Sequence, residues 1–552
     1  MTPKNITVET KLISSLEKVF ADEPLKADTY NKGTALNNEV YSFQVAFTTT
    51  GPLIKNVQIK LNSEIEEAVE VRSVGLVPSE FPIYHDHDDN VLRNTPGLFP
   101  DPLYPLYEEG VTVFSNQWRS LWITVHLTEE VKAGTYPIGI VLEDAKGKEL
   151  AKETFVLEVL PIQLPKQSLI HTQWFHTDGI MDQYNVEAFS EDYWYWVEKY
   201  VKTAVEHGIN MLLTPLFTPP LDTEVGGERS TVQLVEVKKE QDTYSFNFDK
   251  LTRWIEMCLE NGLEYFEFSH LFTQWGAYHA PKIIVEENGE KTKLFGWETD
   301  ADSEEYITFL SSFLPKLKDY IYANKLEAKV YLHVSDEPNL EHMASYKHAR
   351  DLMSEYLGEL PIIDALSDYA FYENGLVKKP IPATNHIQPF LENEVPDLWT
   401  YYCCAQYQDV ANRFFAFPSA RNRIIGLQLY KYNIKGFLQW GYNFWFSQLS
   451  KKSIDPFKNT DAGYGFPSGD AFIVYPGAKE PIESIRMEVF YDALQDMRAL
   501  QLLESLIGKE AVMEIIEGDL AKTLTFETYP QQAEWLLEKR AEINRQIAAE
   551  MK

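Results

Sequence analysis

Hydrophobic residues follow two different patterns along the chain, one before and one after about residue 165. Over roughly the first 165 residues, apolar side chains alternate with polar ones, which predicts strands that each bury one face. The alternation is clearest in Tyr41, Phe43, Val45 and Phe47 and again in Leu121, Ile123, Val125 and Leu127. We therefore expect residues 1–165 to form an N-terminal antiparallel β-sandwich domain.

A proline-containing linker, residues 160–167, precedes a rhythm of strand, helix and strand. A helix is expected from about Glu191, with Ser190 as its N-cap and Gly208 closing it. Apolar strands are expected at 172–175, 209–214, 263–269, 328–335, 361–365, 398–404 and 436–440. This alternation implies a parallel sheet, and its span favours a (β/α)8 TIM-type barrel over residues 166–500. Residues 501–552 are expected to form a C-terminal helical segment packing on the barrel.

Composition restricts the classes of function. A length of 552 residues suggests two or three domains, and 44% hydrophobic residues indicate a folded globular protein. The net charge is −33 and no basic stripe is present, which argues against nucleic acid and anionic membranes as partners. The first twenty residues contain no apolar signal region, so the sequence predicts a cytoplasmic location. The three cysteines do not suggest a disulfide framework.

The strongest chemical signal is a pair of adjacent acids after an apolar strand. In KVYLHVSDEPN, the strand ends in Asp336 and Glu337, and Pro338 stops regular pairing just after them. In a barrel, functional residues gather at the carboxyl ends of the strands. Two close carboxylates resist simultaneous ionisation, so one pKa should rise, which suits a general acid that protonates a glycosidic oxygen. The alternative is that Asp-Glu-Pro only begins a loop and caps the helix starting near Leu340.

Aromatic and amide side chains follow other predicted strands. Walls of this kind, with Asn, Gln and His donors, are what a pocket needs to bind an amide-bearing sugar. The candidates are His270, Gln274, Trp275, Trp399, Tyr401, Tyr402, Trp440, Asn443 and Trp445.

A metal site is a separate hypothesis. In YHDHDDN, His85 and His87 could hold an ion together with neighbouring aspartates, although the segment reads as an exposed loop. Neither a nucleophile elbow nor a phosphate-binding glycine loop is present. The sequence therefore indicates no cofactor, and the preferred interpretation includes no metal.

Several long segments resemble the catalytic domain of glycoside hydrolase family 123, and the resemblance spans most of the chain. They are SHLFTQWGAYHAP (269–281), YLHVSDEPN (331–339), LWTYYCC (398–404), KGFLQWGYNFW (435–445) and GDAFIVYPG (469–477). The helix-like tail PIESIRMEVFYDALQDMRAL and the N-terminal PDPLYPL and AGTYPI also resemble this family.

The resemblance implies a retaining hydrolase that removes terminal β-linked N-acetylhexosamine, typically N-acetylgalactosamine, from an oligosaccharide or glycoconjugate. It implies substrate assistance, in which the sugar's own 2-acetamido group is the nucleophile. Asp336 would then orient the acetamido nitrogen, while Glu337 would protonate the leaving oxygen and later activate water. The tryptophans, tyrosines and Asn443 named above would enclose the sugar, with His270 near the rim. Without an export signal, a substrate already inside the cell is expected.

Two other functions stay open at this point. One is an ordinary retaining glycosidase whose nucleophile is a distant carboxylate such as Glu298 or Asp455. The other is a carbohydrate-binding protein without catalytic activity. The sequence does not choose between the galacto and gluco configurations, nor does it give the linkage, the oligomeric state or the pathway.

Overall fold

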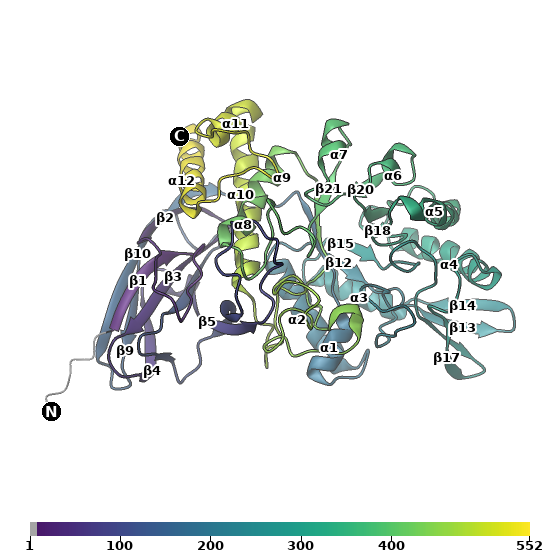
Figure 1. The fold of residues 1–552 in the computed structure, drawn as a ribbon, viewed down its shortest axis with the longest axis horizontal. Helices are drawn as coiled ribbons and strands as arrows, with labels where there is room; N and C mark the ends of the chain where they lie inside the picture. The colour runs from purple at the N-terminus through teal and green to yellow at the C-terminus, as the bar shows by residue number, and fades with distance from the viewer. Residues whose placement is uncertain (1–7, 552) are drawn as a thin grey trace.

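The computed structural model describes residues 8–551, which form a mixed α/β fold (Figure 1). The N-terminal part contains two five-stranded sheets that are antiparallel except where β2 pairs with β10. The first has the order β1 (Val8–Ser14), β3 (Glu39–Thr49), β8 (Arg119–Leu127), β5 (Val69–Ser79), β6 (Gly97–Pro105). The second has the order β2 (Lys32–Asn37), β10 (Glu149–Gln163), β9 (Gly134–Glu143), β4 (Ile54–Asn62), β7 (Val111–Val113).

The predicted alternation accounts for the core between these two sheets. Phe43 of β3 stacks on Phe155 of β10, with ring centroids 4.0 Å apart. Val45 and Phe47 are buried in the same cluster, because every second side chain of a strand points to one face. The expectation of N-terminal antiparallel sheets is confirmed.

The C-terminal part contains a curled parallel sheet. Its order is β18 (Val330–Leu332), β15 (Tyr265–Phe268), β12 (Met211–Thr214), β11 (Ile170–Gln173), β22 (Gly436–Gln439), β21 (Trp399–Tyr401). A parallel pair, β19 (Ile363–Ala365) and β20 (Lys379–Ile381), stands beside it. Single parallel bridges join this pair to both ends of the sheet, Leu332 to Ile362 and Ala383 to Tyr401.

Helices separate the parallel strands along the chain. Ser190 caps α2 as predicted, since its Oγ accepts a hydrogen bond from the backbone N–H of Tyr193 at 3.2 Å. The helices are α1 (Thr177–Tyr184), α2 (Glu191–Glu206), α3 (Asp249–Glu260), α4 (Glu304–Ala323), α5 (Met343–Leu357), α6 (Ala370–Glu373), α7 (Gln388–Glu392), α8 (Ser419–Arg423) and α9 (Ile425–Lys431). Short 3-10 turns occur at η1 (Glu66–Ala68), η2 (Leu340–His342) and η3 (Gln448–Ser450).

An additional four-stranded sheet interrupts this pattern. It has the order β14 (Thr243–Asn247), β13 (Glu236–Glu240), β16 (Ile283–Glu287), β17 (Glu290–Phe295), and in Figure 1 it lies at the end of the molecule far from the N-terminal sheets. Its strands come from the segments that follow β12 and β15. The pattern of hydrophobic residues does not predict this sheet.

Three helices complete the chain, α10 (Ile485–Ile507), α11 (Lys509–Glu517) and α12 (Ala533–Glu550). Figure 1 shows α12 beside β2 of the N-terminal sheets. The predicted boundary between residues 500 and 501 falls within α10. No helix in residues 8–551 has the length and apolar character needed to cross a bilayer.

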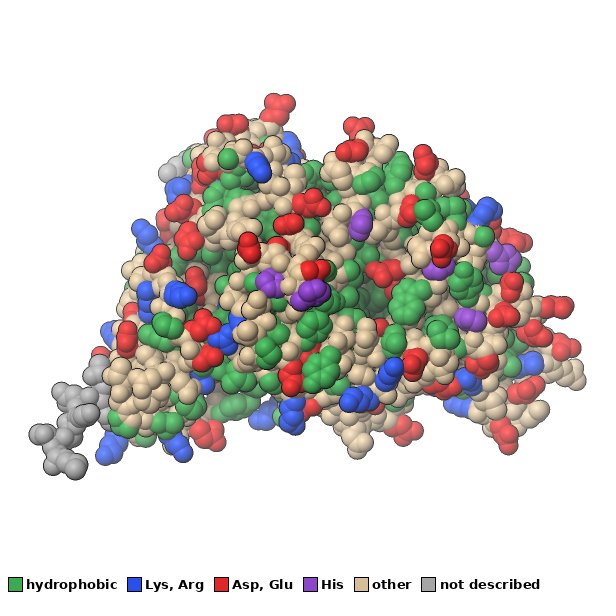
Figure 2. All heavy atoms as spheres, in the orientation of Figure 1, with side chains coloured by type: hydrophobic (Ala, Val, Ile, Leu, Met, Phe, Trp, Pro, Cys, Tyr) green, Lys and Arg blue, Asp and Glu red, His purple; other side chains and the backbone are tan. Residues whose placement is uncertain are grey.

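Buried ion pairs join α10 and α12 to the N-terminal sheets. Asp101 of β6 accepts two hydrogen bonds from Arg486 of α10, at 2.8 and 2.9 Å. Arg540 of α12 binds Glu39 of β3 at 2.7 Å. On the surface, Figure 2 shows acidic side chains spread over the visible face, as the net charge of −33 requires.

Candidate active site

A pocket of about 190 Å³ opens at the carboxyl ends of the parallel strands. Trp174 directly follows β11, Asp336 and Glu337 follow β18, and Trp440 follows β22. Parallel strands bring the side chains that follow them to one edge of a sheet. The lining residues are Trp174, Leu221, Asp222, Gln274, Trp275, Asp336, Glu337, Ala365, Tyr401, Cys403, Cys404, Leu438, Trp440, Gln448, Leu449 and Phe466.

The backbone holds the two acids at this pocket. The Glu337 N–H donates to the carbonyl oxygen of Ala365 at 3.0 Å, and Glu337 has a φ of 44°, which is rare outside glycine. Asn339, rather than either acid, caps the following turn by accepting from the Glu341 N–H at 3.0 Å. The structure therefore does not support the capping interpretation of Asp336 and Glu337.

The backbone at the rim of the pocket, beside Asp336 and Glu337, is also held by hydrogen bonds. Trp275, Gly276 and Ala277 are three consecutive residues with positive φ, at 58°, 125° and 57°. The Trp275 N–H donates to the carbonyl oxygen of Asp336 at 2.9 Å. Hydrogen bonds between Thr273 and His279 close this loop, so the backbone at Trp275 is held at the rim, where this residue is 41% exposed.

Electrostatics give the two carboxyl groups different environments. Burial and the neighbouring Glu337 raise the pKa of Asp336 well above its ordinary value. Glu337 instead accepts a hydrogen bond from the Tyr401 hydroxyl, with Oη to Oε1 at 2.6 Å. Burial and Glu337 also raise the pKa of Tyr401, so this hydroxyl stays a proton donor. Two neighbouring carboxyl groups in such different environments can hold and exchange a proton, as acid and base catalysis requires.

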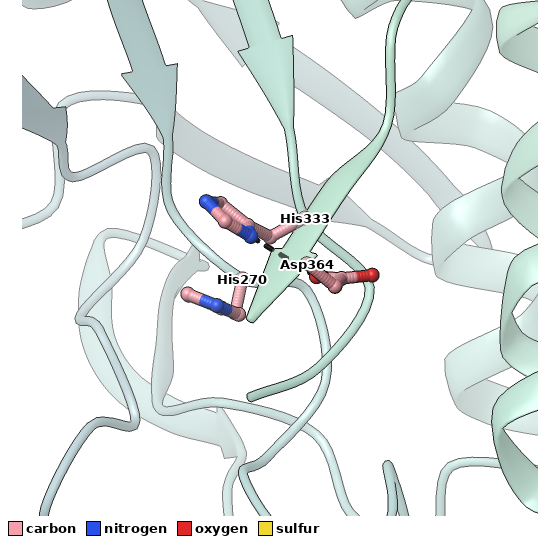
Figure 3. A group of neighbouring side chains, drawn as sticks. All are labelled: His270, His333 and Asp364. Atoms are coloured by element: carbon pink, nitrogen blue, oxygen red, sulfur yellow. Dashed lines mark hydrogen bonds and ion pairs between the residues drawn. The ribbon is translucent and has the colours of Figure 1, made fainter. Parts of the chain in front are cut away.

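A buried network of charged side chains lies within the curled sheet. His333, which directly follows β18, hydrogen-bonds Asp364 of β19 at 3.0 Å through Nδ1 (Figure 3). Through Nε2 it hydrogen-bonds Glu267 of β15 at 2.5 Å. Glu267 also accepts from the Trp174 indole N–H at 2.7 Å, which links the network to the pocket wall. Burial alone would lower the pKa of His333, but Asp364 and Glu267 raise it to about 9.

His270 stacks on His333, with ring centroids 4.1 Å apart (Figure 3). Its ring nitrogens have no hydrogen-bond partner, and burial together with the charge on His333 lowers its pKa. Donor atoms of His270, His333 and Asp364 lie within 4.8 Å of one another, a spacing that one metal ion could bridge. Both nitrogens of His333 already bind carboxylates, which leaves no lone pair for a metal. We interpret Glu267, His333 and Asp364 as a charged hydrogen-bond network that supports the pocket, with the ring of His270 stacked against it.

The protonation states of His333 and His270 give a testable prediction. NMR titration of histidine-labelled protein should show His333 as an imidazolium at pH 8 and His270 as neutral at pH 5.5, because carboxylates hold one ring and apolar burial surrounds the other. The folded pKa of His333 exceeds the unfolded value of about 6.5. Its stabilising contribution is therefore complete below about pH 6.5 and is lost as the pH rises through about 9.

The His333→Gln and His270→Gln variants assign the two signals. A resonance that disappears in His333→Gln and titrates below pH 7 would contradict the interpretation of this network.

Six of the eleven residues predicted for the site line one pocket: Asp336, Glu337, Gln274, Trp275, Tyr401 and Trp440. The indole N–H of Trp440 donates to Asp470 at 3.0 Å, which fixes the orientation of this ring. Burial raises the pKa of Asp470 to about 7.

The other five do not line the pocket. His270 is 1% exposed and belongs to the buried network, not to the rim. Trp399 packs on Tyr331 within the sheet's interior. Tyr402 points the opposite way from Tyr401, as neighbours on a strand must, and packs on Phe437.

Asn443 and Trp445 are occupied by structural hydrogen bonds. The Asn443 side chain bonds both the N–H and the carbonyl oxygen of His176. The Trp445 indole donates to the carbonyl oxygen of Val474 at 3.1 Å and packs on Tyr200. Proximity in sequence to Trp440 therefore did not place these side chains in the pocket.

Sequence reasoning missed two pocket residues of chemical interest. Trp174 lies near the end of the predicted strand 172–175 and directly follows the observed strand β11, so the rule that located Asp336 could have found it. Asp222 lies in the long segment between β12 and β13, where no pattern distinguishes it from the other acids of the chain. Glu267, His333 and Asp364 also had a signal, since each is a polar residue within an otherwise apolar strand.

The loop containing His85 and His87 is held by Asp88. Its carboxylate binds Arg421 at 2.7 and 2.8 Å, while His85 points into solvent with 97% of its side chain exposed. Among the described residues, His85 and His87 do not belong to a group of metal-ligating side chains.

Comparison with solved structures identifies a relative of the same size. A family 123 glycoside hydrolase from Clostridium perfringens, studied for hydrolysis of glycolipid glycans, has a TM-score of 0.75 at 15% identity. The alignment covers 99% of this chain and 98% of that one.

More distant matches are a β-glucuronidase from Parabacteroides merdae and a β-galactosidase from Bacillus circulans sp. alkalophilus. The first has a TM-score of 0.30 at 11% identity and covers 89% of this chain and 52% of that one. The second has a TM-score of 0.34 at 9% identity and covers 60% of this chain and 56% of that one.

No curated protein matches the sequence. The family comparison, in contrast, matches the glycoside hydrolase 123 catalytic domain over residues 174–503, which contain every residue that lines the pocket. The chain belongs to glycoside hydrolase family 123.

Proposed function

We propose that this glycoside hydrolase removes terminal β-linked N-acetylhexosamine, foremost N-acetylgalactosamine, from an oligosaccharide or glycoconjugate with retention of configuration. The observation that carries the proposal is the placement of Asp336 and Glu337, two consecutive carboxylic acids, in one aromatic pocket. Consecutive residues on one wall cannot easily act from opposite faces of the anomeric carbon. A nucleophile supplied by the substrate's 2-acetamido group removes that requirement.

The proposed reaction assigns a proton movement to each acid. Glu337 donates its proton to the glycosidic oxygen as the bond from C1 to that oxygen breaks. The acetamide carbonyl oxygen bonds to C1, and Asp336 takes the N–H proton to give a neutral oxazoline. Water then attacks C1 as the bond between C1 and the oxazoline oxygen breaks, Glu337 accepts a proton from this water, and Asp336 returns to nitrogen the proton that it took in the first step. Burial raises the pKa of Asp336, and the charge that Glu337 acquires on giving up its proton raises it further, which favours transfer of the N–H proton to Asp336.

The strand pairings support a (β/α)8 barrel as the frame for this chemistry. The six-stranded sheet and the pair β19–β20, linked by the two bridges, connect eight parallel strands in a ring. We propose the domain limits 1–165, 166–500 and 501–552 for the sandwich, the barrel and the C-terminal helical segment.

The main alternative uses a carboxylate of the protein as nucleophile. Glu298 is half-exposed and pairs with Lys293 at 3.0 Å, and Asp455 pairs with Lys458 at 2.7 Å. Neither lines the pocket with Asp336 and Glu337. Asp222 does line it, so in this alternative Asp222 is the candidate nucleophile.

The test compares nitrophenyl β-N-acetylgalactosaminide, β-N-acetylglucosaminide and β-galactoside. We expect cleavage only of substrates that carry the acetamido group, and faster cleavage of the galacto isomer. NMR of the first product should show the β-anomer. Cleavage of the plain β-galactoside at a comparable rate would contradict substrate assistance. Tight binding of these sugars without any release of product would indicate a binding protein.

A further inference from the structure

The segment after β12 carries a third carboxylate of the pocket, Asp222, and its backbone is held on both sides. The Asp222 N–H donates to Oε1 of Gln274 at 2.7 Å. Its carbonyl oxygen accepts from the hydroxyl of Ser450 at 2.6 Å. Asp222 itself has a φ of 38°, so this position is determined by the contacts and not by local preference.

Only one of its two carboxylate oxygens is occupied. Oδ2 accepts from the backbone N–H of Leu449 at 2.8 Å. Within residues 8–551, no donor bonds to Oδ1, and the side chain faces the pocket. Burial raises the pKa of Asp222 to about 6, while the Leu449 N–H opposes this shift, so the group is mainly a carboxylate at neutral pH.

Nearby cations and amides are committed elsewhere. Arg229 forms two hydrogen bonds with Asp178, at 2.7 and 2.8 Å, and does not pair with Asp222. The amide of Gln274 uses its oxygen for the Asp222 backbone and its nitrogen for the carbonyl oxygen of Thr223. The free oxygen of Asp222 is thus a fixed acceptor that the protein does not satisfy.

We infer that Asp222 accepts a hydrogen bond from a ring hydroxyl group of the terminal sugar and thereby contributes to sugar specificity. A carboxylate can only accept, and sugar hydroxyl groups are the donors that the proposed substrate brings into the pocket. A site built to bind a hydroxyl group rejects analogues that lack it, because its buried polar atom is then left without a partner. The inference rests on the proposed function, since it names a contact within the same pocket.

The test combines Asp222→Asn with aryl N-acetylhexosaminides that lack the hydroxyl group at C3, C4 or C6. Asn keeps an oxygen for the Leu449 N–H but turns a donor toward the sugar. On the complete substrate we expect kcat/KM to fall about 10- to 100-fold. On one deoxy substrate the same variant should change kcat/KM less than threefold, because the partner hydroxyl group is already absent.

Glu224→Gln is the matched control. Glu224 lies in the same segment and forms an exposed ion pair with Lys451 at 3.1 Å, so this variant should keep the activity of the parent protein. Equal losses for Asp222→Asn on the complete substrate and on all three deoxy substrates would overturn the inference. So would a loss above about 10⁴-fold together with a covalent sugar adduct on Asp222, which would make it the nucleophile.

A failure of the proposed function is distinguishable from a failure of this inference. If the wild-type protein cleaves no acetamido substrate, calorimetry with free N-acetylgalactosamine and its deoxy forms tests the contact alone. For every sugar except one, we expect a higher Kd in Asp222→Asn than in the wild-type protein. The exception is the deoxy sugar that lacks the hydroxyl group bound by Asp222. An equal rise in Kd for all of these sugars, or no rise for any of them, overturns the inference.

Discussion

Replacing Glu337 by Gln is expected to lower kcat by about 10²–10⁴-fold on substrates with a poor leaving group, because the variant cannot donate a proton to the glycosidic oxygen. Gln has the size of Glu and can still accept the Tyr401 hydrogen bond, so the unfolding temperature should change little. Steady-state kinetics with aryl glycosides of graded leaving-group pKa measures the effect. The loss should shrink as the leaving group becomes more acidic and needs less protonation.

Glu341→Gln is the matched control, because Glu341 is an exposed acid four residues further along the same segment. It should retain the wild-type kcat. A Glu337→Gln variant with full activity on poor leaving groups would reject Glu337 as the general acid. A loss independent of the leaving group would assign Glu337 another role.

The second large effect is on stability, and it concerns a buried ion pair outside the active-site pocket. Asp101→Ala is expected to lower the free energy of unfolding by about 3–5 kcal/mol, since it leaves the buried Arg486 without its carboxylate. Both side chains are almost fully buried, and the Tyr475 hydroxyl also donates to Asp101, at 2.5 Å. Arg486 has other acceptors, the carbonyl oxygens of Gly469 and Phe472, but neither carries a charge. Urea denaturation followed by circular dichroism measures the change.

Glu143→Ala provides the comparison. Glu143 pairs with Lys60 at 2.7 Å between two strands of the second N-terminal sheet, and the lysine is 63% exposed. Exposed pairs contribute at most about 1 kcal/mol. Equal losses for the two variants would contradict a special role for the Asp101–Arg486 pair in joining the N-terminal sheets to α10.

The sequence predicted the features that depend on local pattern. Alternation located β3 and β8 among the N-terminal strands, and the apolar runs located all but one of the strands of the curled sheet and its adjoining parallel pair. The exception, β20, has only three residues and contains Pro380, so neither its length nor its composition is typical of a strand. Two strands of the inserted sheet, β13 and β17, were missed because charged residues fill them.

The pocket was predictable only where a residue ends a strand. Asp336, Glu337, Tyr401 and Trp440 satisfy that condition. Asp222 reaches the pocket through tertiary contacts with Gln274 and Leu449, which no local pattern records. Tyr402 failed because one step along the chain from Tyr401 reverses the direction of the side chain. Trp399 points to the same side as Tyr401 but lies two residues earlier, at the start of β21, where it is buried inside the sheet.

The strained rim at Trp275–Ala277 has a consequence for ligand affinity. Non-glycine residues with positive φ cost about 1–3 kcal/mol each and persist only where surrounding contacts determine them. That free energy is spent during folding, before any sugar arrives. A ligand entering the pocket therefore finds the backbone of this rim already in place, so that ordering it costs little conformational entropy on binding, which is the benefit of preorganisation.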